Sequence, residues 1–108
     1  MNTKIPILAA RVKENPTDSF SKFALALELL KEEKKGQAKM LFESIEAQDP
    51  EYVGVYYHLG KLYSEIEENK KALETYKKGI EVSIRLGDLH ARSELQGALL
   101  NLEIELED

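Results

Sequence analysis

Residues 56–76, with the sequence YYHLGKLYSEIEENKKALETY, contain the pattern on which the expected fold depends. Its apolar and small residues recur every three or four positions, first at Tyr56, Leu59, Gly60 and Tyr63 and then at Ala72 and Tyr76. In a helix, residues at this spacing lie over one another on one face. Gly60 and Ala72 are small where two helix backbones must approach, and Tyr63 and Tyr76 fill the space beside that contact. The stretch therefore predicts two closely packed antiparallel helices.

The same pattern occurs 34 residues upstream. Six positions match in chemical type: Leu25 with Leu59, Ala26 with Gly60, Leu29 with Tyr63, Ala38 with Ala72, Phe42 with Tyr76 and Pro16 with Pro50. Two positions depart from the pattern, because Lys22 stands in the aromatic position of Tyr56 and Ile84 stands where a further proline would fall. Recurrence at one fixed period indicates a repeat architecture.

This spacing resembles the tetratricopeptide-repeat (TPR) pattern W-x2-L-G-x2-Y followed by A-x3-F, with tyrosine at both end aromatic positions. The resemblance covers residues 17–84. It implies an all-α, right-handed stack of helical hairpins with about six antiparallel helices. It also implies a protein that holds protein partners.

The chain has 108 residues, which fits one domain because domains commonly contain roughly 100–200 residues. We expect residues 1–16 to form a half-repeat helix, residues 17–50 and 51–84 two full repeats, and residues 85–108 a capping helix. A repeat array needs such a terminal helix to cover its apolar flank. The inward stripe of that helix is expected to consist of Leu95, Ala98, Leu99, Leu102 and Leu106.

Short polar segments mark the expected turns. Residues 34–36, with the sequence KKG, are expected to form the turn inside the first repeat. Asn69 is the expected N-cap of the second helix of the second repeat. Gly87 suits the left-handed position after that helix, and Asp88 suits the N-cap of the last one.

The composition disfavours several classes of protein. The net charge is −5 and lysines alternate with glutamates, so no basic surface for nucleic acid is expected. No apolar stretch reaches the ~18 residues of a membrane span, and we expect no signal peptide because the first residues lack its apolar core. The absence of cysteine leaves no disulfides and no thiolate metal site. These features favour a cytoplasmic protein.

No arrangement of side chains predicts catalysis or a cofactor. The two histidines, His58 and His90, lie on different expected helices and outside any metal-ligand spacing such as H-E-x-x-H. The glycines are scattered at turns and packing positions rather than gathered in a phosphate-binding loop. A catalytic acid and base would need a concave apolar pocket that shifts a pKa, and the pattern predicts none. We therefore expect neither an enzyme nor a bound metal or cofactor.

In TPR proteins the first helix of each repeat lines a concave groove, so the resemblance implies a set of partner-binding residues. They are Phe20, Phe23, Leu27 and Lys31 in the first repeat and Tyr57, His58, Lys61 and Glu65 in the second. Aromatic and apolar groups beside lysines suit an extended or helical peptide. The alternative for Phe20, Phe23 and Leu27 is packing beneath the N-terminal helix. For His58 it is a partly exposed helical position without a partner contact.

The leading interpretation is a non-catalytic protein- or peptide-binding adaptor that uses this groove. The alternative is a structural module that associates with a copy of itself, through the apolar groove or through the last helix. On that helix Ser93, Gly97, Leu100 and Ile104 form a narrow stripe opposite the inward leucines. Small residues beside exposed aliphatic ones suit a symmetric contact between helices, which would make a homodimer.

Overall fold

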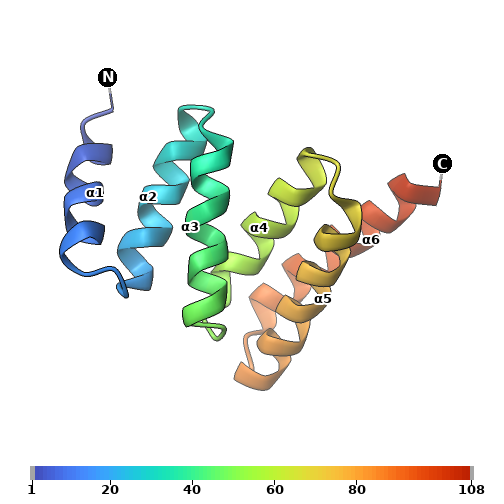
Figure 1. Cartoon of the computed structure of the whole chain (residues 1–108). Coiled ribbons are helices and arrows are strands. Elements are labelled where there is room, and N and C mark those ends of the chain that lie inside the picture. Colours follow the sequence, from blue (N-terminus) through green and yellow to red (C-terminus); the bar gives the residue numbers. More distant parts are fainter. Residues whose placement is uncertain (1, 108) are drawn as a thin grey trace. The chain divides into compact units, whose positions relative to one another are not determined.

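The computed structural model describes residues 2–107, and all regular structure in that range is α-helical (Figure 1). The helices are α1 (Lys4–Glu14), α2 (Ser19–Lys31), α3 (Lys35–Gln48), α4 (Gly54–Glu65), α5 (Asn69–Leu86) and α6 (Leu89–Glu107). The prediction of an all-α chain with six antiparallel helices is confirmed.

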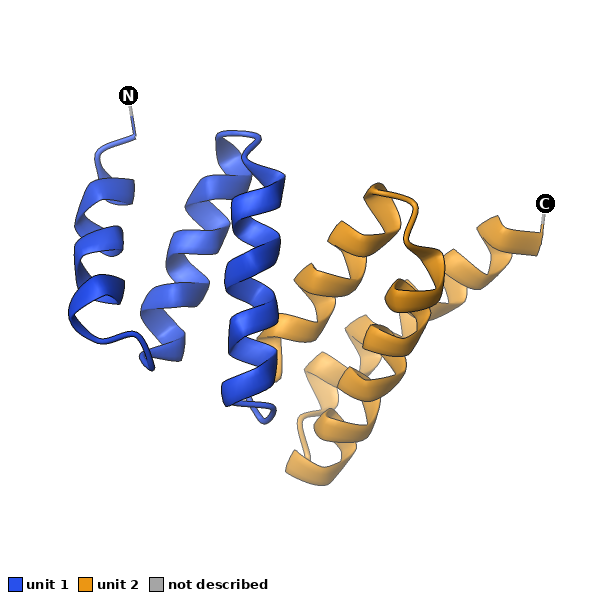
Figure 2. Cartoon of the chain, in the orientation of Figure 1, with its two compact units in different colours: residues 1–52 blue, residues 53–108 orange. Residues whose placement is uncertain are grey.

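The helices form two compact units (Figure 2). The first unit, residues 1–52, contains α1 to α3, and within it α2 packs against both α1 and α3. The second unit, residues 53–108, contains α4 to α6, and within it α5 packs against α4 and α6 while α4 also contacts α6. The division into a half-repeat, two repeats and a capping helix within a single domain stays a prediction.

The buried positions of the two units follow the repeat pattern. In α2 and α3 the buried apolar residues are Leu25, Ala26, Leu29, Ala38, Phe42 and Ile45. Their equivalents in the second unit include Leu59, Tyr63, Ala72 and Tyr76, which are also buried. Pro16 and Pro50 lie in the connections that precede α2 and α4. The matched positions are therefore the apolar contacts that hold each pair of helices together.

Lys22, the polar residue in an aromatic position, is buried like the tyrosine it replaces, with 6% of its surface exposed. Its Nζ donates hydrogen bonds to Ser44 Oγ at 2.9 Å and to Gln48 Oε1 at 2.8 Å. A buried ammonium group is tolerated only when such partners replace water. Both partners come from α3, so this polar contact joins the two helices of the first repeat.

The turn inside each repeat is made by a glutamate in the left-handed backbone region. Glu33 has a φ of 61° and Glu67, at the equivalent position, has a φ of 62°. The N–H of Lys34 then donates to the carbonyl of Leu29 at 2.9 Å and closes the end of α2. This is the capping pattern that usually uses glycine, because few side chains tolerate a positive φ.

Two sequence-based turn assignments were therefore wrong. Because the left-handed glutamate ends α2 early, α3 already begins at Lys35, and residues 34–36 are not the turn. Asn69 is the first residue of α5, and Glu68 occupies the N-cap position. The assignments after α5 are confirmed: Gly87 has a φ of 70°, and Asp88 Oδ1 accepts a hydrogen bond from the N–H of Ala91 at 3.0 Å.

The inward face of α6 agrees with the prediction except at its end. Leu95 and Leu102 are buried, with 1% and 5% of their surface exposed, and Ala98 and Leu99 are half-buried. Leu106 is 44% exposed, so its assignment to the inward stripe was wrong. The last turn of α6 lies beside the beginning of the antiparallel α5, where few side chains remain to cover it.

Two glycines set the distance between α4 and α5. The backbone of Gly60 in α4 lies against the ring of Tyr76 in α5, and an added Cβ would overlap that ring. The backbone of Gly79 in α5 lies against Tyr56 in α4, and an added Cβ would lie only 2.5 Å from the tyrosine Cβ. Each helix therefore places a tyrosine on a glycine of the other.

We expect Gly60→Ala to destabilise the protein and Gly97→Ala to stabilise it. Overlap with the Tyr76 ring should cost on the order of 1–3 kcal/mol, because the ring is buried and cannot move aside easily. At Gly97, inside α6, an added Cβ would meet no atom within 4 Å, so alanine should gain up to about 1 kcal/mol from helix propensity. Urea melts measure both effects, and equal melting of the two variants would contradict the close packing at Gly60.

Candidate functional site

The predicted site residues of the first unit differ in their surroundings. Phe20 is 67% exposed on α2 and does not pack beneath α1. Phe23 is half-buried, and its ring lies against Phe42 and Tyr52, with centroid distances of 5.9 and 5.3 Å. Leu27 is half-buried as well. Of the three apolar residues, Phe20 is the one whose side chain faces mainly solvent.

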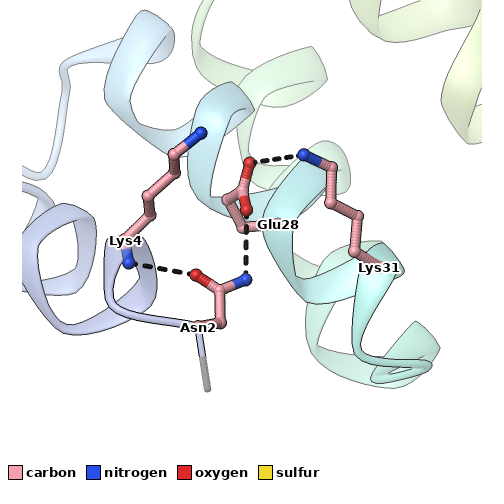
Figure 3. A network of polar contacts seen from close by, with 4 residues as sticks. All are labelled: Asn2, Lys4, Glu28 and Lys31. Atoms are coloured by element: carbon pink, nitrogen blue, oxygen red, sulfur yellow. Dashed lines mark hydrogen bonds and ion pairs between the residues drawn. The ribbon is translucent and has the colours of Figure 1, made fainter.

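Lys31, the fourth predicted residue of this unit, takes part in a small polar network at the end of α2 (Figure 3). Its Nζ lies 3.0 Å from Glu28 Oε2, and Asn2 Nδ2 donates to Glu28 Oε1 at 3.0 Å. Hydrogen bonds from Lys31 and then from Asn2 hold the pKa of Glu28 below its usual value. The network links the start of α1 to α2, and the repeat pattern gave no signal for it because Asn2 lies outside the repeats.

The predicted residues of the second unit meet in one hollow. Tyr57, Lys61 and Glu65 of α4 line a space of about 270 Å³. The other lining residues are Ser64 at the end of α4, Tyr76 of α5, and Ala98, Asn101, Leu102 and Glu105 of α6. The repeat pattern identified the α4 wall and missed the α6 wall, since α6 lies beyond the second repeat.

Tyr76 forms the buried side of the hollow. Only 4% of its surface is exposed, and its ring rests on the backbone of Gly60. Burial raises the pKa of Tyr76 to about 12, and the charges of Glu65 and Glu105 act in the same direction. The phenol therefore keeps its proton at neutral pH and presents an uncharged hydroxyl.

His58 lies beside the hollow but does not line it. Its ring meets the ring of Tyr57 edge-on, with the centroids 5.4 Å apart. Burial lowers the pKa of His58, the nearby Glu94 of α6 opposes this shift, and Lys61 adds to it. His58 is therefore held mainly neutral at pH 7, in a half-buried position on the α6 side of α4.

Neither a metal site nor a membrane helix is found in the part of the chain that the structure describes. No group of three or more histidine, cysteine, aspartate or glutamate side chains among residues 2–107 could hold a metal ion. None of the described helices is long and apolar enough to cross a membrane.

Comparison with solved structures identifies the family. A tetratricopeptide repeat domain protein from Salinibacter ruber, in its crystal structure, is 46% identical and superposes with a TM-score of 0.78 over 80% of this chain and 96% of that chain. This chain belongs to the tetratricopeptide-repeat family. The solution structure of a TPR domain protein from Salinibacter ruber gives the same identity and TM-score over 82% of this TPR chain and 90% of that one.

A more distant match shows the fold alone. The solution structure of a Bordetella parapertussis protein is 22% identical, with a TM-score of 0.81 over 97% of this TPR chain and 91% of that chain. No family model matches the chain, and no curated protein matches it.

The surroundings of His58 predict how its pKa responds to charge removal. We expect a pKa below 6.5, a further decrease in Glu94→Gln, and an increase in Lys61→Gln, all measurable by NMR titration of the ring protons. Because the folded chain binds this proton less tightly than the unfolded chain, the contribution of His58 to stability should be present above pH 6.5. It should be lost as the pH falls from there through the folded pKa. Opposite shifts in the two variants would contradict the placement of His58 between these charges.

Proposed function

We propose that this TPR protein is a non-catalytic adaptor that binds a protein or peptide through the exposed side chains of α2 and α4. TPR domains generally mediate protein–protein interactions, and the family is generally non-catalytic. The observation that carries the proposal is the hollow beside Tyr57, where an aromatic side chain, polar groups and a buried hydroxyl meet. Binding sites of this kind combine an aromatic anchor position with a few polar groups that fix orientation.

On α2, Phe20 offers a second contact for the same class of partner. Its ring is 67% exposed, and the neighbouring Phe23 and Leu27 are half-buried. Lys31 lies further along the helix with 64% of its side chain exposed. An amphipathic or extended peptide with apolar anchors suits such a surface.

The proposal distinguishes two adjacent tyrosines. Tyr57 is half-buried and lines the hollow, whereas Tyr56 has no exposed surface and packs against Gly79. We expect Tyr57→Ala to weaken partner binding at least about tenfold, because truncating an aromatic anchor typically costs ~2 kcal/mol or more. Its melting temperature should change little. Tyr56→Ala should lower stability by about 3–5 kcal/mol, as removal of a buried aromatic ring usually does.

The measurement requires a partner captured from a lysate with the wild-type chain, followed by binding isotherms and thermal melts of both variants. The matched pair separates binding from folding, since the two residues are neighbours of identical type. Unchanged binding by a folded Tyr57→Ala protein would place the partner surface elsewhere.

A second candidate function, self-association, is favoured by the outward face of α6. Leu100 and Ile104 are 56% and 52% exposed, and together with Leu106 and Leu73 of α5 they line a hollow of about 460 Å³. The occupant that the charges favour is a second copy of this chain. The start of α6 carries Arg92 and its end carries several glutamates, so two copies of α6 in antiparallel orientation bring opposite charges together.

Self-association predicts a change of mass in the double variant Leu100→Glu with Ile104→Glu. The wild type should form dimers at high protein concentration, and the charged side chains should return it to monomers by placing carboxylates in an apolar contact. Sedimentation equilibrium measures the mass, and circular dichroism checks that helicity is unchanged. A wild type that stays monomeric at millimolar concentration excludes this function without any variant.

A further inference from the structure

The hollow between α4, α5 and α6 has an acidic lining. It contains two carboxylates, Glu65 and Glu105, and one ammonium group, that of Lys61. Lys61 is an exposed residue located one helical turn before Glu65. No lysine or arginine follows Arg92 in the sequence, so α6 adds only negative charge to this region. An anionic ligand would therefore be repelled from the α6 wall of the hollow.

The ends of two helices strengthen the same preference. Ser64 and Glu65 are the last residues of α4, and Glu105 lies in the last turn of α6, so both helices end at the hollow. The carboxyl end of a helix carries a partial negative charge, which attracts cations. The effect adds to the carboxylates and is independent of them.

An independent feature indicates that the hollow takes a polar ligand. Tyr76 lines it although 96% of this residue is buried, a fraction that follows from its 4% exposure. Within residues 2–107 its hydroxyl has no hydrogen-bond partner. A buried polar group without a partner is costly, so a ligand atom that bonds to this hydroxyl gains what folding left unused.

The remaining lining groups suit one side chain that is both cationic and long. The ring of Tyr57 provides a face on which a guanidinium or ammonium group can lie. The side-chain amide of Asn101 adds a carbonyl acceptor. A volume of about 270 Å³ is smaller than the usual range for whole small-molecule sites, roughly 300–1,000 Å³. It accommodates a single side chain rather than a helix.

We propose that this hollow binds an arginine or lysine side chain of the partner protein, with the cation between Glu65 and Glu105, against the face of Tyr57 and within reach of the Tyr76 hydroxyl. The inference rests on the proposed adaptor function and specifies what that partner must contain. The partner segment carries at least one basic residue, and its apolar anchors occupy other positions.

The test uses the full chain labelled with ¹⁵N and two small probes, N-acetyl-arginine amide and its uncharged isostere N-acetyl-citrulline amide. We expect the arginine probe to shift the resonances of Tyr57, Asn101 and Glu105 with a dissociation constant on the order of 1 mM, a usual strength for so small a ligand. The citrulline probe should bind at least tenfold more weakly. Equal binding of the two probes overturns the proposal, because recognition would then not depend on charge.

Two variants of α6 provide a matched comparison. Glu105→Gln removes a carboxylate that lines the hollow, whereas Glu103→Gln removes one from the same helix that does not line it. Arginine binding should weaken at least threefold in Glu105→Gln and stay unchanged in Glu103→Gln, with both proteins melting like the wild type. Equal weakening in the two variants would reduce the effect to general acidity and overturn the specific site.

The same variants separate this inference from the adaptor function. With a captured partner, Tyr57→Ala and Glu105→Gln should both weaken binding. If Tyr57→Ala weakens it and Glu105→Gln does not, the adaptor function stands and the basic anchor is wrong. If the arginine probe binds as described but neither variant affects the partner, the hollow is a cation site and the adaptor function fails there, together with the claim that the partner supplies the cation.

Discussion

The reciprocal contact of two tyrosines with two glycines fixes the geometry of the second unit. Tyr76 covers Gly60, and Tyr56 covers Gly79, so neither helix can move along the other without a steric clash. This contact has a direct effect on the candidate site. Because Tyr56 is locked in the interface, the next residue, Tyr57, turns about 100° away and comes to line the hollow. Tyr76 likewise serves as both a packing residue and a wall of that hollow.

The first unit solves the same packing problem with a different pair of residues. At the positions equivalent to Tyr56 and Gly79 it has Lys22 and Ile45, and both are buried. An isoleucine leaves no flat backbone surface for a tyrosine, whereas a lysine can run alongside it and end at Ser44 and Gln48. The departure from the repeat pattern at Lys22 is therefore compensated at a second position, and the two changes belong together.

The sequence predicted the features that depend on periodicity and missed those that depend on neighbours outside it. Residues such as Leu59, Ala72 and Phe42 were assigned correctly because helix geometry alone brings them to one face. The left-handed turns at Glu33 and Glu67 were missed, since glutamate gives no local signal for a positive φ. The α6 wall of the hollow, including Asn101 and Glu105, depends on how a non-repeat helix packs on α5, which no repeat period describes.

The buried ammonium of Lys22 also bears on how a chain with two similar hairpins avoids pairing the wrong helices during folding. If α2 paired with α5 in the equivalent register, Lys22 would meet Lys78 and Val82 in place of Ser44 and Gln48. That arrangement would set like charges together and leave the ammonium without acceptors in an apolar contact, which is strongly unfavourable. Repeat proteins are prone to such exchange between similar elements. A single lysine thus gives the first hairpin a chemical label that only its own second helix can read.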